Sequence, residues 1–393
     1  MNSTTTNSEP TGVDSMRVII AGGGTGGHLY PGIAIAEEVT SRPGGEVLFV
    51  GTARGLEAKV VPAAGYPLEF LEVSGLKRKG VRGLLRGLLR LPRAYIGSRA
   101  ILRRFRPDLV FGVGGYASGP IVLAAALSGH ATAILEQNSR PGITNRLLGR
   151  FVRRIFVAFD ESRRYFVAAK TTLSGNPVRR GFFTERLQTG ATTATETLLI
   201  VGGSQGARAV NDLVCAMVPL LVPLLTPILA RRGTLPRIVH QTGAADFERI
   251  RRRYQEAGGD VVVHARPYID DMPGELAKAT LVIGRAGALT LAELAIVGCP
   301  AILIPLPTAA DDHQTANARE LANAGAAVLL PQAEATAAGL ADLVASLMND
   351  DGRRAAMAAA MAALGRPGAG RAIVDELERL VPPTPTPTPG GKH

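Results

Sequence analysis

The sequence contains little cysteine, and this scarcity excludes whole classes of protein. Its two cysteines, Cys215 and Cys299, lie far apart among 393 residues, without a C-x-x-C spacing or a nearby histidine cluster. A disulfide framework and a structural zinc site are therefore not expected, and a reducing cytoplasm is the default compartment.

Targeting signals and an uninterrupted apolar span are lacking as well. Residues 1–15 have neither the basic nor the apolar block of a signal peptide, so we predict a disordered leader. Residues 382–393 alternate Pro and Thr, which predicts an extended tail. The longest uncharged apolar run, 214–230, contains Pro219, Pro223 and Pro227. Because each proline removes a helix hydrogen bond, we predict a buried helix that ends near the first or second proline, followed by a loop.

Acidic residues are missing from one long segment. Residues 74–106 hold 11 Lys or Arg and no Asp or Glu, which equals the formal net charge of +11. A helix here has Arg82, Arg86 and Arg90 on one side and leucines opposite. Two readings stay open: a helix lying on an anionic membrane surface, and a solvated helix packing its leucines on the protein core. Nucleic-acid binding is disfavoured, because the segment has few aromatic residues and no known reader motif.

A glycine-rich stretch, AGGGTGGHLYPGIAIAEEV (21–39), follows an apolar run and leads into a predicted helix. Such a junction binds anions through bare backbone N–H groups and the helix dipole. Its glycines fit the dinucleotide pattern G-x-G-x-x-G, but a nicotinamide enzyme also needs an acid at the end of the second strand. The candidate strand EVLFV runs into Gly-Thr-Ala-Arg (51–54) instead. An NAD-dependent dehydrogenase is thus disfavoured, and His28 needs another explanation.

The two halves of the chain resemble each other. VIIAGGGTGG (18–27) aligns with LLIVGGSQGA (198–207), and LVFGVGG (109–115) aligns with LVIGRAG (281–287). This predicts two α/β domains, each a parallel sheet covered on both faces, with their glycine loops facing across a cleft. We expect domains at 16–178, completed by 367–381, and at 179–366. Such a cleft suits a reaction that joins two substrates.

Eight motifs in order give the chain a specific resemblance: GGTGGHLYPGIAIA, GVGGYASGP, EQNSRPGITNRLL, GNPVR, GGSQGA, YIDDM, RAGALTLAEL and DDHQTANA. The chain resembles the MurG family of GT-B glycosyltransferases, which have two Rossmann-like doubly wound domains. The resemblance implies inverting transfer of N-acetylglucosamine from UDP-N-acetylglucosamine to the MurNAc 4-hydroxyl of lipid I, giving lipid II for peptidoglycan. It also implies a peripheral position on the cytoplasmic side of the cell membrane, within a cell-wall synthesis complex.

Two alternative functions remain open at this point. One is a GT-B transferase with another lipid or small-molecule acceptor, and the other is a non-catalytic nucleotide-sugar-binding membrane protein. No cofactor is expected. No D-x-D motif occurs, so the usual carboxylate pair for a metal-bound diphosphate is missing and we expect no metal.

The second half should hold the donor. The loop GGSQGA offers N–H groups and a hydroxyl to the diphosphate, and Glu293 can accept from both ribose hydroxyls. Asn317 lies three residues after Gln314, so the two share a helix face as candidate sugar contacts. Where the family usually has Ser, this chain has Ala286, so one hydroxyl near the nucleotide is lost. With the positions implied by resemblance, the donor candidates are Thr25, Gly26, Gly27, Asn138, Arg179, Ser204, Gln205, Ile269, Ala288, Leu289, Thr290, Glu293, Gln314 and Asn317.

The first half should take the acceptor. His28 is the candidate general base, since an imidazole titrates near neutrality, and Glu136 is the rival base. Gly114, Gly115, Tyr116 and Asn145 are weaker acceptor-side candidates. Because the acceptor implied by the resemblance is lipid-linked, we expect the basic segment of this half to dock on the membrane. The residues expected to do so are Leu76, Lys77, Arg78, Lys79, Arg82, Leu84, Leu85, Arg86, Leu88 and Leu89.

Overall fold

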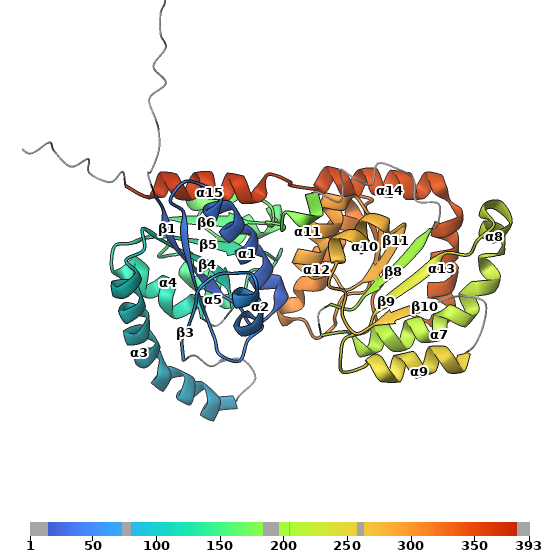
Figure 1. Ribbon diagram of the computed structural model, residues 1–393, viewed down its shortest axis with the longest axis horizontal. Helices are drawn as coiled ribbons and strands as arrows, with labels where there is room; N and C mark the ends of the chain where they lie inside the picture. Colours follow the sequence, from blue (N-terminus) through green and yellow to red (C-terminus); the bar gives the residue numbers. More distant parts are fainter. Residues whose placement is uncertain are drawn as a thin grey trace, which may run out of the picture.

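The computed structural model describes residues 15–72, 80–115, 117–183, 196–203, 205–257 and 263–382, with only the backbone at 80–91 and 310. Within these ranges the chain forms two parallel sheets that lie side by side in an elongated molecule (Figure 1). This confirms the prediction of two parallel α/β sheets. The predicted leader and tail lie outside the described residues, apart from residues 15 and 382.

The first sheet has seven parallel strands in the order β3-β2-β1-β4-β5-β6-β7. They are β1 (Arg17–Gly22), β2 (Glu46–Gly51), β3 (Leu68–Phe70), β4 (Leu109–Gly114), β5 (Ala131–Glu136), β6 (Arg154–Val157) and β7 (Thr171–Leu173). The central strands are apolar at nearly every position, because a parallel sheet buries both of its faces.

Helices cover both faces of this sheet. Val18 and Ile20 of β1 pack with α1 (Gly26–Thr40), α2 (Glu57–Ala63) and α15 (Ala369–Leu380). Ile19 and Ala21 point to the other face and pack with α3 (Gly80–Phe105), α4 (Ser118–Leu127) and α5 (Ile143–Leu148). Two short 3₁₀ helices, η1 (Asp160–Tyr165) and η2 (Ala168–Lys170), lead to β7.

The C-terminal helix α15 returns to the first sheet, as its position above α1 in Figure 1 shows. Arg42, just after α1, forms ion pairs with Asp375 at 2.6 Å and with Glu378 at 2.5 Å. Ile373 and Leu377 are fully buried in the core beneath it. Apolar burial and charge pairing therefore hold this helix in one place.

The second sheet has six parallel strands in the order β10-β9-β8-β11-β12-β13, which repeats the order of the first six strands of the first sheet. They are β8 (Thr197–Val201), β9 (Arg237–Gln241), β10 (Val263–Arg266), β11 (Leu281–Gly284), β12 (Ala301–Leu303) and β13 (Ala327–Leu329). Each of the two aligned glycine loops thus follows the same central strand of its sheet.

The second sheet is also covered on both faces. One core contains residues of α7 (Arg208–Leu224), α8 (Thr226–Arg232) and α13 (Ala337–Asn349), with α9 (Phe247–Ala257) packed against α7. The other contains residues of α10 (Met272–Lys278), α11 (Ala288–Val297) and α12 (His313–Asn323), which follows η3 (Ala310–Asp312). Helix α14 (Asp351–Leu364) contributes to both cores.

The prediction for residues 214–230 is partly wrong. Helix α7 is buried on one side and ends at Leu224, near the second proline as predicted, but a second helix, α8, follows in place of the predicted loop. The prolines lie on the exposed side, whereas four side chains opposite are buried: Val214, Met217, Val218 and Leu221. Burying each contributes about 1.5–3 kcal/mol, which outweighs a cost of about 3 kcal/mol for each proline.

No single described helix is long and apolar enough to cross a membrane. Helices α7 and α8 together meet the length and composition for a span, but they are bent by 57° at the break between them. Core packing accounts for the buried apolar residues of α7, whereas Leu220 and Leu224 are exposed.

Candidate active site

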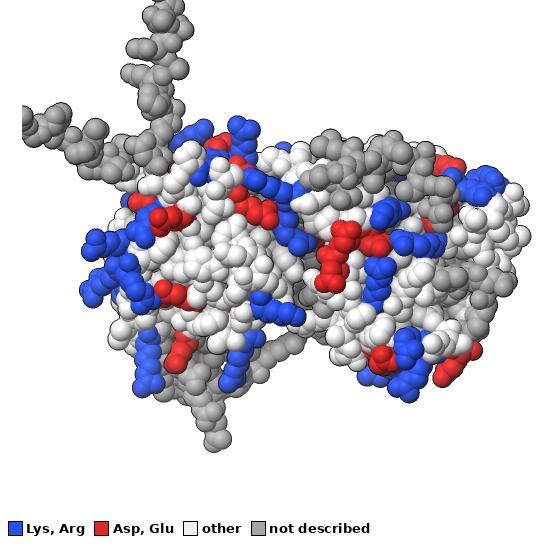
Figure 2. All heavy atoms as spheres, viewed as in Figure 1, with Lys and Arg blue, Asp and Glu red and all other residues white. Residues whose placement is uncertain are grey.

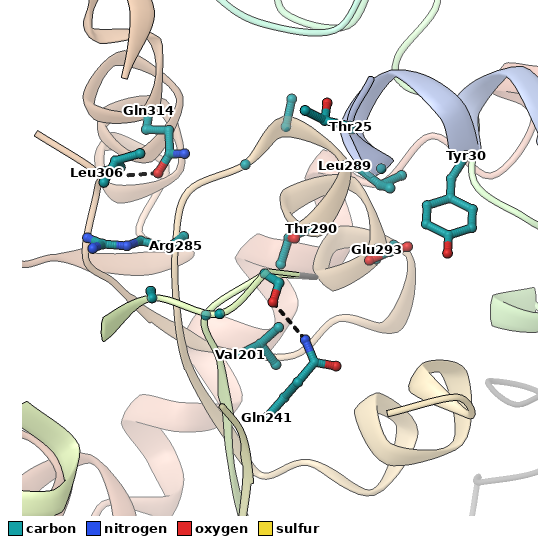
Figure 3. A pocket seen from close by; sticks show the side chains of 18 of the residues that line it. Thr25, Tyr30, Val201, Gln241, Arg285, Leu289, Thr290, Glu293, Leu306 and Gln314 are labelled. Atoms are coloured by element: carbon teal, nitrogen blue, oxygen red, sulfur yellow. Dashed lines mark hydrogen bonds between the residues drawn. The ribbon is translucent and has the colours of Figure 1, made fainter. Parts of the chain in front are cut away.

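A cleft of about 830 Å³ opens between the two halves. The first half lines it with its glycine loop and the start of α1, and the second with residues around β8 and α11 (Figure 3). The cleft brings together most of the residues predicted from the sequence: Thr25, Gly26, Gly27, His28, Asn138, Arg179, Ile269, Ala288, Leu289, Thr290, Glu293 and Gln314.

His28 lies in the first turn of α1 and faces the cleft from the first half. Its Nδ1 is 3.3 Å from Oε1 of Gln137, a residue that follows β5. Burial is the main cause that lowers the pKa of His28 below its usual value, and His313 across the cleft lowers it further. The imidazole is therefore neutral at pH 7, the form that accepts a proton.

Glu136, the rival base, does not line the cleft. Its buried carboxylate accepts hydrogen bonds from Asn138 N at 3.0 Å, Gly142 N at 3.2 Å and Asn145 Nδ2 at 2.9 Å. Burial raises its pKa, and these donors oppose the rise. Glu136 and Asn145 thus hold the loop that contains Asn138. Of the two predicted bases, only His28 lines the cleft.

The two acceptor-side glycines pack the loops of the first half together. Gly114 has φ +92°, and a Cβ there would lie 2.7 Å from Nδ1 of His28. A Cβ on Gly115 would lie 2.4 Å from the carbonyl oxygen of Gly23. Neither glycine lines the cleft, and Tyr116 lies outside the described residues.

Glu57 is a buried carboxylate that sequence reasoning missed. It accepts from Gly24 N at 2.7 Å and from Thr52 N and Oγ1 at 2.8 Å each. Glu57 lies three residues after the Gly-Thr-Ala-Arg stretch (51–54) that follows the second strand. It fastens the first glycine loop to the end of β2.

Arg179 and Glu293 form the charged centre of the donor side. Their Nη2 and Oε1 atoms are 3.8 Å apart. Burial raises the pKa of Glu293 to about 7, and Arg179 opposes this rise. The guanidinium also lies 4.2 Å from the ring centroid of Tyr30, whose hydroxyl is 3.1 Å from that of Tyr268 (Figure 3 shows Tyr30 and Glu293). Tyr30 belongs to α1 and to the motif GGTGGHLYPGIAIA, but it was not among the predicted site residues.

Gln241, at the end of β9, organises the backbone on the donor side. Its Nε2 donates to the carbonyl of Gly203 at 3.0 Å, and its Oε1 accepts from Ile269 N at 2.9 Å (Figure 3). The N–H of Ile269 is therefore already engaged. No motif indicated Gln241, because its partners come from other parts of the chain. Gln205 does not line the cleft, and Ser204 lies outside the described residues.

Gln314 and Asn317 occupy different environments although they share a helix. Gln314 lines the cleft, and its Oε1 accepts from Leu306 N at 3.0 Å (Figure 3). Asn317 is fully buried and accepts from Ser139 N and Oγ at 2.9 Å each, so it joins the two halves. Its Nδ2 donates to the carbonyl of Ala286, which is itself buried. The structure therefore does not bring Asn317 to the cleft.

Among the residues that the structure describes, no group of three or more His, Cys, Asp or Glu is arranged to hold a metal ion. The start of α11 at Ala288 lines the cleft, and a helix N-terminus favours negative charge through its free N–H groups. Of the predicted membrane residues, 76–79 lie outside the described part, and the others lie on α3 where only the backbone is described.

Comparisons with known proteins agree with this architecture. Residues 18–157 match the glycosyltransferase family 28 N-terminal domain, and residues 197–370 match the corresponding C-terminal domain. A crystal structure of Acinetobacter baumannii MurG is 30% identical, covers 93% of this chain and 99% of its own, and has a TM-score of 0.71. The protein is therefore a glycosyltransferase of the GT-B fold.

Curated relatives give a narrower assignment. A protein of Anaeromyxobacter dehalogenans is 49% identical over 367 residues, and the match covers 93% of each chain. A protein of Myxococcus xanthus is 47% identical over 361 residues, and the match covers 92% of each chain. Both are named UDP-N-acetylglucosamine–N-acetylmuramyl-(pentapeptide) pyrophosphoryl-undecaprenol N-acetylglucosamine transferase. The chain belongs to this family of transferases, the MurG family.

Proposed function

We propose that the protein transfers N-acetylglucosamine from UDP-N-acetylglucosamine to the MurNAc 4-hydroxyl of lipid I, which gives lipid II. The observation that carries this proposal is the cleft between the halves, with His28 on one side and the Arg179–Glu293 pair on the other. A two-substrate transfer needs both sides in one space. Membership of the family supports this choice of donor and acceptor.

The second half binds the donor in this proposal. The Glu293 carboxylate accepts from the ribose hydroxyls, and the backbone near Ile269 contacts the uracil. Gln314 and Asn138 contact the sugar, while the loop at 202–207 and the start of α11 bind the diphosphate. N–H groups at a loop and a helix N-terminus stabilise the departing UDP without a metal ion.

The first half binds the acceptor and activates it. The neutral imidazole of His28 takes the proton of the acceptor hydroxyl as its oxygen forms a bond to the anomeric carbon. The bond from that carbon to the UDP phosphate oxygen breaks, and its electron pair leaves with UDP. Direct attack inverts the anomeric centre, so an α-linked donor gives a β-linked product. In this proposal, residues 16–178 and 367–381 form the acceptor domain, and residues 179–366 form the donor domain.

We place the protein on the cytoplasmic side of the cell membrane, within a cell-wall synthesis complex, with the α3–α4–α5 layer facing anionic lipid. Helices α3, α4 and α5 pack on the same face of the first sheet, so their outer sides form one layer. Lys and Arg gather at the left edge of the molecule, near α3 (Figure 2). Large apolar side chains are exposed on or near this layer: Ile96, Leu127, Ile143, Leu147, Phe151 and Val167. Basic and apolar residues together favour anionic membrane surfaces.

The test measures UDP release from UDP-N-acetylglucosamine by the purified protein with anionic vesicles, with and without lipid I, in EDTA. We expect release that requires lipid I and persists in EDTA. Release with another lipid or a small-molecule acceptor, but not with lipid I, would replace the acceptor. Tight binding without release would leave a nucleotide-sugar-binding protein, and loss of activity in EDTA would overturn the metal-free mechanism.

A further inference from the structure

Gln137 lies directly behind His28 and is almost completely buried. It follows β5, which pairs with β4 in the first sheet, and both strands end beside the start of α1 (Figure 1). Its Nε2 donates to the carbonyl of Val113 in β4 at 2.7 Å, and its Oε1 is 3.3 Å from Nδ1 of His28. One side chain thus connects a strand end to the candidate base.

The contact with Val113 determines which way the amide points. A backbone carbonyl only accepts hydrogen bonds, so the NH₂ group of Gln137 must face Val113 and its oxygen must face His28. An amide oxygen also only accepts, so Nδ1 of His28 must carry the proton. In this tautomer Nε2 is the nitrogen with a free lone pair.

Gly114 adds a steric constraint on the same ring. Its φ of +92° and its lack of a side chain let the backbone approach Nδ1, where a Cβ would lie 2.7 Å away. The imidazole is therefore held between the Gly114 backbone and the Gln137 amide. His28 itself lines the cleft.

We infer that Gln137 is a positioning residue for catalysis, which holds His28 in the Nδ1–H tautomer so that Nε2 receives the proton of the acceptor hydroxyl. This inference rests on the proposed function. The proton moves from the acceptor oxygen to Nε2, that oxygen bonds to the anomeric carbon, and UDP leaves with the electron pair. The imidazolium then releases its proton to water.

Substitution of Gln137 should shift the pH dependence in a direction set by the new side chain. His28 acts as a base, so activity rises as the pH passes its pKa. The Gln137 hydrogen bond raises that pKa, whereas burial and His313 lower it. Gln137→Met removes the acceptor and moves the acid limb of kcat to lower pH. Gln137→Glu puts a carboxylate beside Nδ1 and moves the limb to higher pH.

The experiment measures kcat and KM of transfer to lipid I against pH for the wild type and both variants. We expect Gln137→Met to lower the plateau kcat by about ten- to hundredfold, because base catalysis contributes about 10²–10⁴. KM for UDP-N-acetylglucosamine should change less than about twofold, because the hydrogen bonds of this amide go to Val113 and His28 and not to a predicted donor-binding residue. Gln137→Glu should retain more kcat than Gln137→Met. Acid limbs that stay in place in both variants would overturn the inference.

A double-substitution cycle separates positioning from a general effect on folding. In the background of His28→Ala, Gln137→Met should lower kcat no further, because both changes remove one function. An equal loss in both backgrounds would overturn the inference. The Kd for UDP and the thermal unfolding midpoint verify folding, and Gln137→Glu carries the test if Gln137→Met does not fold. A wild type that never transfers to lipid I would remove the proposed function, whereas a fully active Gln137→Met would remove only this inference.

Discussion

At the scale of single residues, Glu293 is a carboxylate kept out of water beside one cation. Burial raises its pKa to about 7 from 4.5. A carboxyl whose pKa rises on folding stabilises the protein fully below about pH 4.5, and this contribution is lost as the pH rises through about 7. Above about pH 4.5, the burial of this group therefore lowers the stability of the fold.

We predict that Glu293→Gln weakens UDP binding by about ten- to hundredfold, since hydrogen bonds to a charged group contribute about 1.5–3 kcal/mol. The same variant should remove a fall in stability between about pH 4.5 and 7. Calorimetric titration and thermal unfolding across this pH range measure both effects. Glu248→Gln, on the exposed side of α9, should change neither. A wild-type pH profile retained by Glu293→Gln would contradict the role of burial.

Gly114 has a positive φ and lies against the imidazole of His28. Gly114→Ala should destabilise the protein and lower kcat, because the new Cβ would lie 2.7 Å from His28 Nδ1 at a φ of +92°. Positive φ at a non-glycine residue costs on the order of 1–3 kcal/mol. Gly65→Ala is the matched control, with φ +81° and open space around its Cβ. Both variants should lose stability, but only Gly114→Ala should lose kcat; an equal loss of kcat would exclude a specific effect on His28.

At the scale of elements, α7 shows how tertiary packing overrides a local signal. The prolines predict a helix end near the first or second of them, and the buried side of α7 carries the helix past Pro219 to Leu224, one residue after Pro223. The sequence did not predict α8, because a proline is tolerated in the first turn of a helix as well as in a loop. The strands were predictable, since continuous apolar runs before glycine loops require burial on both faces.

We predict that Pro219→Ala raises the free energy of unfolding. The substitution restores a backbone N–H inside α7 and removes a proline that costs about 3 kcal/mol in a helix interior. An increase of about 1–3 kcal/mol in urea unfolding is expected. Pro227→Ala, in the first turn of α8 where proline is tolerated, should change stability little. Equal effects of both substitutions would show that the position within the helix does not matter.

The cleft residues also divide into those that the sequence predicted and those that it did not. The glycine loops and charged residues such as Glu293 lie within sequence motifs, so the sequence predicted them. Gln137 lies within the motif EQNSRPGITNRLL, but the motif does not indicate its contacts with Val113 and His28. Gln241 lies outside every motif, and the partners of both glutamines are distant in sequence. Asn317 was assigned to the cleft from its helical spacing with Gln314, but spacing gives a shared side and not what that side contacts.

At the scale of the whole molecule, the surface of the first half differs from that of the second. Leu127 and Phe151 are 60% and 53% exposed near the α3–α4–α5 layer, in the half that carries the basic segment. This layer covers the sheet whose loops position His28. The proposed membrane-facing layer thus lies in the same half as His28, although the helix that carries His28 packs on the other face of the sheet.

We predict that Leu127→Glu with Phe151→Glu weakens co-sedimentation with anionic vesicles by about tenfold or more, because apolar burial is lost and negative charge is added. Transfer to lipid I in vesicles should fall in parallel, while Kd for UDP stays unchanged. Leu229→Glu, on α8 of the second half and 41% exposed, is the matched control. Vesicle binding that is equally weakened by Leu229→Glu would contradict the assignment of this layer.

The carboxylate of Glu57 makes the two halves of the duplicated fold different from each other. Two sheets with one strand order present two similar glycine loops, which by themselves would compete for the same phosphate groups. In the first half a negative side chain binds the loop at Gly24, whereas in the second half the neutral amide of Gln241 contacts Gly203. The two loops are therefore held by different chemical groups, although the strands before them occupy the same place in their sheets. A single acidic residue thereby breaks the symmetry of the duplicated fold.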